Sequence, residues 1–475
     1  MNNSTIAAIA TPIGSGGIGI IRISGQKAVS IAASLFQRSH LASNVSSENS
    51  IGNPLGSTDR FKSHHFYHGF IVHPGTEIVL DEVLLTVMKA PHSYTREDIV
   101  EIHTHSGRVV MGAVLESVLR QGARLADPGE FTKRAFINGR IDLIQAEAVV
   151  DIINAKTDEA LKVATRLILG GLGKQVESIR ESLVHVLASF EAAIDFPEEA
   201  EEIIEAESTR EHIESQAINV LKKLIEQYDD LHVVRDGLKL VIVGRPNVGK
   251  SSLMNCLIQK DRAIVTSVPG TTRDFIEEHL SIEGIPVIIT DTAGIQETKD
   301  PVEVIGVQKA REYIDQADLI LFMVDASSSL LKEDKIIYQQ LKAKPSILVI
   351  NKSDLVDKDF KFELPELWGD PSRVKVSALY SKGIEALKTL ILEICVGGKL
   401  SDSENGIVPN LRHKIALESC LRSTLAVVEG VRIGRPLELV VMDLKDAIDS
   451  LGGITGATTQ EDILDEIFSR FCVGK

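Results

Sequence analysis

The stretch that decides the fold is KLVIVGRPNVGKSSLMNCLI, residues 239–258. An apolar, β-branched run predicts a strand that ends at Gly244, and the apolar run after Ser251 predicts a helix. The loop between them fits the spacing G-x-x-x-x-G-K-[ST] with Gly244, Gly249, Lys250 and Ser251. In such a loop backbone N–H groups close around a β-phosphate, the lysine balances the β/γ charge, and the hydroxyl ligates Mg²⁺. The stretch therefore predicts a nucleotide-binding P-loop.

Three further motifs follow in the order that a guanine-nucleotide site requires. In DTAG (291–294), Asp291 can hold Mg²⁺ through water and the Gly294 N–H can meet a γ-phosphate. In NKSD (351–354), Asp354 offers two acceptors that match guanine N1–H and N2–H₂, a donor pair that adenine lacks. SAL (377–379) suits a backbone contact to guanine O6. One such motif alone could be a turn without a ligand, but four in register predict GTP.

The loop VTSVPGTTRD (265–274) lies between the P-loop and DTAG. A threonine there can complete the Mg²⁺ shell once γ-phosphate is bound, and we assign Thr272 beside Ser251. The residues predicted to bind GTP are Asn247, Val248, Gly249, Lys250, Ser251, Ser252, Thr266, Ser267, Val268, Pro269, Gly270, Thr271, Thr272, Asp291, Thr292, Ala293, Gly294, Asn351, Lys352, Ser353, Asp354, Ser377, Ala378 and Leu379.

The residue directly after DTAG is Ile295, where Ras-like GTPases carry the glutamine that orients water. An isoleucine cannot polarise water, so hydrolysis needs another positioning group and another positive charge. The segment IQETKDPVEVIG (295–306) offers three carboxylates, which are either surface charges or a water-positioning group: Glu297, Asp300 and Glu303.

Composition and charge limit the remaining functions. The chain has 475 residues, a formal net charge of −16, and four cysteines, of which none forms a CxxC pair. An acidic chain repels nucleic-acid phosphate on average, so any RNA contact needs a local basic patch or a partner's surface. No secretory signal or membrane-spanning run is visible, and we expect a cytoplasmic protein.

Apolar periodicity divides the chain into four predicted regions. Residues 1–123 mix short strands and helices, residues 124–235 are helical, residues 236–397 alternate strands and helices around a mainly parallel sheet, and residues 398–475 are helical again. Helical sequence on both sides predicts that the α/β domain is inserted into a helical domain. The last predicted helix carries an apolar stripe, and Thr458 with Glu461 has capping-box spacing.

Three short motifs outside the predicted α/β region have competing interpretations. GSGGIG (14–19) fits a dinucleotide fingerprint, but the strand-like IIRISG follows it where a helix is required, so that interpretation fails. In EIHTHSG (101–107), Glu101, His103 and His105 share one face of a strand, and a polar strand face is favoured over a metal site. FCVGK (471–475) is a poor prenylation box, because Gly474 is not aliphatic.

The motifs GRPNVGKSS, PGTTRD, DTAGI and NKSD, together with TPIGSGGIGIIRISG near the start and FCVGK at the end, resemble the bacterial family of tRNA modification GTPases called MnmE or TrmE. The resemblance covers essentially the whole chain. It implies an N-terminal α/β domain that binds tetrahydrofolate and dimerises, a helical domain, and an inserted Ras-like G domain.

The resemblance also implies how hydrolysis is activated. In the family, K⁺ and face-to-face dimerisation of G domains replace an arginine finger. Carried over to this sequence, the potassium ligands are Asn247, Thr266, Val268 through its carbonyl, and Thr271. The water-positioning carboxylate is Glu303. Arg273 is better explained as a switch-loop salt bridge than as an arginine finger.

A second site follows from the resemblance alone. It implies a pocket for 5-formyl-tetrahydrofolate or a related folate at Arg22, Glu101, Arg140 and Lys475. At Arg140 the positive charge is kept, although a member of the family has lysine at the matching position. Cys472 is either a reactive thiol of the modification chemistry or a packed, inert thiol at the end of a helix.

The implied partners are a second copy of the chain, tRNA, and the flavoprotein MnmG in a heterotetramer. Together they would add a carboxymethylaminomethyl-type group to C5 of the wobble uridine, position 34, of certain tRNAs. The alternative is a ribosome-assembly GTPase that binds RNA as a switch. The absence of a basic RNA-binding domain in the sequence argues against it.

Overall fold

The computed structural model describes residues 4–14, 16–38, 61–199, 205–261, 277–291, 312–341, 344–357, 362–397 and 406–475. The chain divides into two compact units. The first combines Met1–Val150 with Thr455–Lys475, and the second is Asp151–Ile454. The helices that the structure describes include none long and apolar enough to cross a bilayer.

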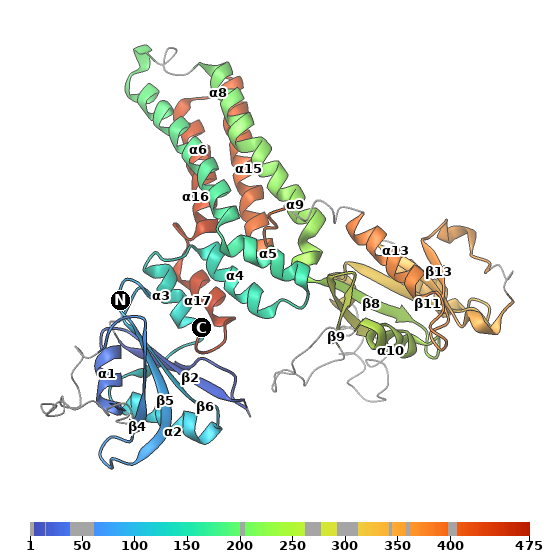
Figure 1. The fold of residues 1–475 in the computed structure, drawn as a ribbon. Coiled ribbons are helices and arrows are strands. Elements are labelled where there is room, and N and C mark those ends of the chain that lie inside the picture. Colours follow the sequence, from blue (N-terminus) through green and yellow to red (C-terminus); the bar gives the residue numbers. More distant parts are fainter. Residues whose placement is uncertain are drawn as a thin grey trace, which may run out of the picture. The chain divides into compact units, whose positions relative to one another are not determined.

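The first unit is built on a seven-stranded sheet with the order β3-β4-β5-β6-β2-β1-β7 (Figure 1). Neighbouring strands are antiparallel except β1 and β7, which are parallel. The strands are β1 (Ile6–Ile9), β2 (Ile18–Ser24), β3 (Phe36–Arg38), β4 (His65–Val72), β5 (Val79–Met88), β6 (Ile99–His105) and β7 (Arg124–Leu125).

Helices α1 (Ala28–Leu35) and α2 (Arg108–Arg120) pack on one face of this sheet. Ile21 and Ile23 of β2 point into that core, so by alternation Arg22 points to the opposite face. There α3 (Glu130–Ile137) packs, with Phe131 against Ile6 and Ala8 of β1. The opposite face is therefore part apolar and part charged.

The end of the chain completes the first unit. Helix α17 (Glu461–Ser469) packs through Phe468, and the turn after it packs through Phe471, on Leu143 and Ala146 of α4 (Leu143–Asn154). The predicted apolar stripe is present in part. The predicted capping box of Thr458 and Glu461 is wrong. The residue at the N-cap is Gln460, which has extended backbone angles (φ −67°, ψ 151°), and the helix begins at Glu461.

The second unit contains a helical bundle drawn from both sides of the α/β region. Helix α15 packs on α9 and α8, and α5 packs on α6 and α9 (Figure 1). The bundle helices are α5 (Asp158–Ile168), α6 (Gly171–Asp195), α8 (Ala206–Ile213), α9 (Asn219–Asp236), α15 (Leu411–Arg432) and α16 (Leu437–Thr455). The α/β region is thus inserted into a helical domain, as the sequence predicted.

The inserted region holds a six-stranded sheet with the order β13-β12-β11-β8-β10-β9. All pairs are parallel except β9 with β10. Helices α10 (Lys250–Asp261) and α13 (Ile384–Val396) pack on one face, and α12 (Lys332–Leu341) packs on the other. The strands are β8 (Leu238–Gly244), β9 (Glu277–Ile282), β10 (Ile285–Asp291), β11 (Leu319–Asp325), β12 (Ser346–Asn351) and β13 (Arg373–Lys375). Because parallel strands end at one edge, β8, β10, β11 and β12 bring their carboxyl ends together.

Candidate functional site

The predicted P-loop leaves the carboxyl end of β8 and enters α10. Two of its residues have left-handed backbones, Asn247 (φ 65°) and Gly249 (φ 98°). A Cβ atom at Gly249 would lie 2.3 Å from the Asn351 amide nitrogen, so only glycine fits there. The loop therefore wraps closely at the start of α10, where helix N–H groups favour an anion.

Lys250 is the first residue of α10 and is buried. Its ammonium donates hydrogen bonds to the carbonyl oxygens of Gly244 and Arg245, both at 2.9 Å. The positive charge is thus held inside the loop. Ser251 and Ser252 follow in the first helical turn and are exposed. A lysine and a hydroxyl in these positions fit the β/γ-phosphates and Mg²⁺ of a nucleotide.

Asn351, the last residue of β12, ties the base motif to the P-loop. Its side-chain amide donates to the Val248 carbonyl at 2.8 Å, and its amide oxygen accepts from the Ala378 N–H at 3.1 Å. Ser377 donates to the Asp354 carboxylate. Three segments predicted from sequence therefore meet: the P-loop, residues 351–354 and residues 377–379. A carboxylate held in this way can accept the two donors of a guanine edge.

Part of the predicted site lies outside the described residues. Asp291 ends β10 beside Ile242 of β8, and its backbone alone is described. The other predicted residues outside the described ranges are Thr266, Ser267, Val268, Pro269, Gly270, Thr271, Thr272, Thr292, Ala293, Gly294 and Glu303. The part of the predicted nucleotide site that the structure describes thus contains the P-loop and the base motif.

The first unit brings Arg22 and Glu101 together across β2 and β6, where they are paired in register. The guanidinium contacts the carboxylate twice, at 2.9 Å through Nε and 2.8 Å through Nη2. The His103 imidazole, 3.6 Å from the second carboxylate oxygen, and the Arg22 guanidinium lower the pKa of Glu101, although burial acts in the opposite direction. Glu101 is therefore ionised at neutral pH.

Two aromatic rings accompany this ion pair. Arg22 lies 5.9 Å from the Tyr94 ring centre and 5.7 Å from that of Phe131. Arg140 lies 4.7 Å from the same Tyr94 ring, so two of the predicted folate residues share one aromatic neighbour. Guanidinium groups, a carboxylate and aromatic faces fit a flat heterocycle that carries acidic groups.

The last turn of the chain joins the same neighbourhood. The Gly474 carbonyl accepts from Arg22 Nη1 at 3.4 Å, and the Lys475 carbonyl accepts from the Phe131 N–H at 3.2 Å. Gly474 has φ 93°, and a Cβ atom there would lie 2.4 Å from the Ile9 carbonyl oxygen. Cys472 is a free, exposed thiol in this turn. The predicted folate residues Arg22 and Glu101 are thus in contact, and the chain end lies beside them.

Tyr94, Phe131 and His103 were not predicted as parts of this site. Tyr94 and Phe131 lie in segments with no motif, and they reach the site through packing on β1 and β2. The sequence placed His103 on the correct strand face beside Glu101, and that alternation was the available signal. Among the residues described, no group of three or more His, Cys, Asp or Glu is arranged to hold a metal ion.

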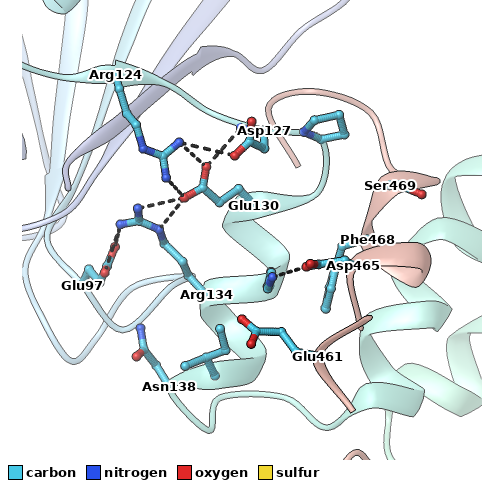
Figure 2. Close-up of a pocket in the computed structure, with 13 residues that line it drawn as sticks. Glu97, Arg124, Asp127, Glu130, Arg134, Asn138, Glu461, Asp465, Phe468 and Ser469 are labelled. Carbon is cyan, nitrogen blue, oxygen red and sulfur yellow. Dashed lines mark hydrogen bonds and ion pairs between the residues drawn. The ribbon is translucent and has the colours of Figure 1, made fainter. Parts of the chain in front are cut away.

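A separate cavity of about 590 Å³ lies between α3 and α17 (Figure 2). Glu130 accepts hydrogen bonds from both Arg124 and Arg134, and Arg134 also reaches Glu97 at 2.9 Å. Burial raises the pKa of Glu130, but these hydrogen bonds outweigh it and the pKa lies below its usual value. The guanidiniums are neutralised internally, so the network fixes α3 to the sheet. No predicted site residue lines the described part of this cavity.

The parallel sheet, the tight loop before α10 and the base motif define a P-loop nucleotide-binding protein of the GTPase class. Two family models match the chain, "GTP-binding protein TrmE N-terminus" over residues 5–140 and "MnmE helical domain" over residues 143–472. The chain belongs to the MnmE (TrmE) family of tRNA modification GTPases. The predicted family and fold class are confirmed.

Similar proteins extend over the full length. The chain is 45% identical over 478 residues to the tRNA modification GTPase MnmE of Carboxydothermus hydrogenoformans, covering 100% of both chains. It is 46% identical over 473 residues to the protein of that name from Thermoanaerobacter pseudethanolicus, covering 99% of each. It is 44% identical to that of Alkaliphilus oremlandii over 476 residues, covering 100% of this chain and 99% of that one.

Proposed function

We propose that the protein is a K⁺-activated GTPase that works with MnmG to add a carboxymethylaminomethyl-type group to C5 of the wobble uridine of certain tRNAs. The observation that carries the proposal is the joining of the P-loop to the base motif through Asn351, in a chain similar to MnmE proteins over its whole length. Work on tRNA would place the protein in the cytoplasm.

The nucleotide would be held by the residues already assembled. Lys250 would exchange its two carbonyl partners for phosphate oxygens, and Asp354 would accept from guanine. Ser251 and Thr272 would hold Mg²⁺, with Asp291 acting through water. When bound, Mg²⁺ neutralises charge on the β- and γ-oxygens.

Potassium would be held by Asn247, Thr266, Val268 and Thr271. Asn247 supports this assignment, because it is exposed on the P-loop with a left-handed backbone. When bound, K⁺ supplies the positive charge that an arginine finger supplies elsewhere. Glu303 would position water where Ile295 cannot. Two G domains facing each other would complete the site.

The first unit would bind the one-carbon donor, 5-formyl-tetrahydrofolate or a related folate, at Arg22, Glu101, Arg140 and Lys475. The paired Arg22 and Glu101 beside Tyr94 support a site for a polar, flat ring. Cys472, exposed in the neighbouring turn, is proposed as the reactive thiol. The complex would be a heterotetramer of two copies of this chain and two of MnmG.

Mass analysis of wobble uridines tests the proposal. In cells that lack this protein, we expect the C5 modification to be lost, and the wild-type gene to restore it. A gene that encodes Cys472→Ser is expected to restore GTP hydrolysis but not the C5 modification of the wobble uridine. Unchanged uridines in the deletion strain would contradict the proposed substrate.

Hydrolysis in different salts tests the activation separately. At equal ionic strength we expect fast GTP turnover in KCl and slow turnover in NaCl. Glu303→Ala is expected to keep GTP affinity and lose turnover. Equal rates in the two salts would remove potassium from the mechanism and leave the tRNA proposal intact.

A further inference from the structure

Asp325 is a carboxylate beside the base motif that no sequence motif identified. It ends β11, directly opposite Asn351 of β12, and the Ala326 N–H donates to the Asn351 carbonyl at 2.8 Å. Its side chain is 13% exposed. Asp325 is thus fixed to the strand that carries the residues expected to contact guanine.

Both oxygens of the Asp325 carboxylate accept hydrogen bonds. Oδ1 accepts from the Ser327 N–H at 2.8 Å and the Ser327 hydroxyl at 2.6 Å. Oδ2 accepts from the Lys352 ammonium at 2.6 Å. Because two hydrogen bonds from Ser327 hold one oxygen, rotation of the carboxylate is restricted, and the other oxygen is directed at the Lys352 ammonium.

Lys352 is therefore restrained at both ends. Its backbone is left-handed (φ 62°) between β12 and the turn that carries Asp354. Its ammonium is bound by Asp325. The four-carbon stem between them would otherwise sample many rotamers, and a side chain that is ordered before binding loses less entropy when a ligand arrives.

We propose that Asp325 is a positioning residue of the guanine site, and that it acts by holding Lys352 extended so that its stem can lie along the purine ring. The inference rests on the proposed guanine-nucleotide function. In this proposal Asp325 acts only through Lys352 and makes no contact of its own with the base or the phosphates.

The charge state of Asp325 agrees with this role. Burial raises the pKa of Asp325, but hydrogen bonds from Lys352 and Ser327 outweigh burial and leave the pKa below its usual value. The carboxylate is therefore ionised at neutral pH. A fully exposed Lys–Asp pair contributes little to stability or binding, but here the Asp325 side chain is only 13% exposed, the Lys352 side chain is 34% exposed, and Lys352 belongs to the base motif.

The first test is the affinity of full-length Asp325→Asn for GDP, measured by calorimetry. We expect an affinity about tenfold lower than wild type, the size of one lost charge-assisted hydrogen bond. Turnover at saturating GTP is expected to stay unchanged while KM rises, because Lys352 belongs to the motif proposed to contact the base and not to the motifs proposed to contact the γ-phosphate. Asp229→Asn is the matched control, since Asp229 binds Lys414 at the same 2.6 Å within the helical bundle.

A double-mutant cycle separates positioning from a general structural role. Lys352→Met keeps the stem and removes the ammonium, and we expect it to lose as much GDP affinity as Asp325→Asn. In the Lys352→Met background, Asp325→Asn is expected to cause no further loss. Additive losses, or unchanged GDP affinity in Asp325→Asn, would overturn the inference. Thermal unfolding of each variant shows whether the fold is retained, and Lys352→Met, an exchange at a partly exposed side chain, still tests the idea if Asp325→Asn unfolds.

Asp354→Asn distinguishes failure of this inference from failure of the guanine site. If Asp354→Asn shifts preference toward xanthine nucleotides while Asp325→Asn binds GDP normally, the inference alone fails. If Asp354→Asn leaves guanine preference unchanged, the proposed guanine site fails, and this inference with it.

Discussion

The nucleotide site and the folate candidate site are built in opposite ways. The nucleotide site uses loops that each follow a parallel strand, and its internal contacts are largely to backbone groups, such as the Gly244 and Val248 carbonyls. The folate candidate site uses side chains from distant segments, and Arg22 contacts a carbonyl 452 residues away. The first site depends on local loop geometry, whereas the second depends on correct packing of α3 and the last turn.

We expect the largest effect from a change of one side chain in the nucleotide site. Asp354→Asn replaces one of two acceptors for guanine with a donor, and a site built for hydrogen bonds rejects a mismatched partner strongly. We expect GTP affinity to fall at least about a hundredfold, with xanthosine triphosphate preferred. Competition binding with both nucleotides measures this, and folate binding in the same samples serves as the control.

We expect the next largest effect from a change of one side chain in the folate candidate site. Glu101→Gln keeps the shape of the side chain and removes the charge that Arg22 pairs with. We expect affinity for 5-formyl-tetrahydrofolate to fall about ten- to hundredfold, the range of a charge-assisted hydrogen bond. GTP turnover by the same variant is expected to match wild type. A loss of GTP turnover as large as the loss of folate affinity would contradict the separation of the two sites.

A smaller effect tests the dependence on packing. Gly474→Val places a Cβ atom 2.4 Å from the Ile9 carbonyl in a left-handed backbone, so the last turn must move. We expect about a tenfold loss of folate affinity, since strain of about 1–3 kcal/mol is involved. Gly434→Val is the control, because Gly434 has a comparable φ of 67° with nothing within 4 Å.

The smallest effect is a dependence of stability on pH. The folded-state pKa of Glu101 is lowered, so its contribution is fully present above the unfolded pKa of about 4.3 and is lost as pH falls through the folded value. We expect the free energy of unfolding of the first unit to decrease more steeply with acid in wild type than in Glu101→Gln. Urea unfolding between neutral pH and acid measures this, and equal slopes would contradict it.

The same contrast explains what could be predicted from the sequence. The P-loop, NKSD and SAL are short, contiguous and tied to strand ends, so their residues and their meeting point followed from spacing and strand order. Asp325 lies on an equally clear strand, but a carboxylate after a strand has many uses, and only the distance to Lys352 shows which one applies.

The folate candidate site could not be derived from spacing. Tyr94 and Phe131 carry no pattern, and they are recruited by tertiary packing. The positive φ of Gly474 depends on the neighbouring strand β1, which no local pattern near residue 474 reveals. Family resemblance supplied Arg22 and Glu101 because it records long-range pairing that periodicity does not contain. The capping box was wrong because spacing alone does not fix the first helical residue: α17 begins at Glu461 after Gln460, two residues later than Thr458 would require.

The discontinuity of the first unit has a consequence for biosynthesis. Its sheet and α3 leave the ribosome early, but α17 and the turn that carries Cys472 emerge only after all of the second unit has been made. The apolar surface of α3 and α4 on which Phe468 and Phe471 pack is therefore not covered by them until translation is nearly complete. A truncated product that stops before residue 455 would keep its P-loop yet leave this apolar surface exposed.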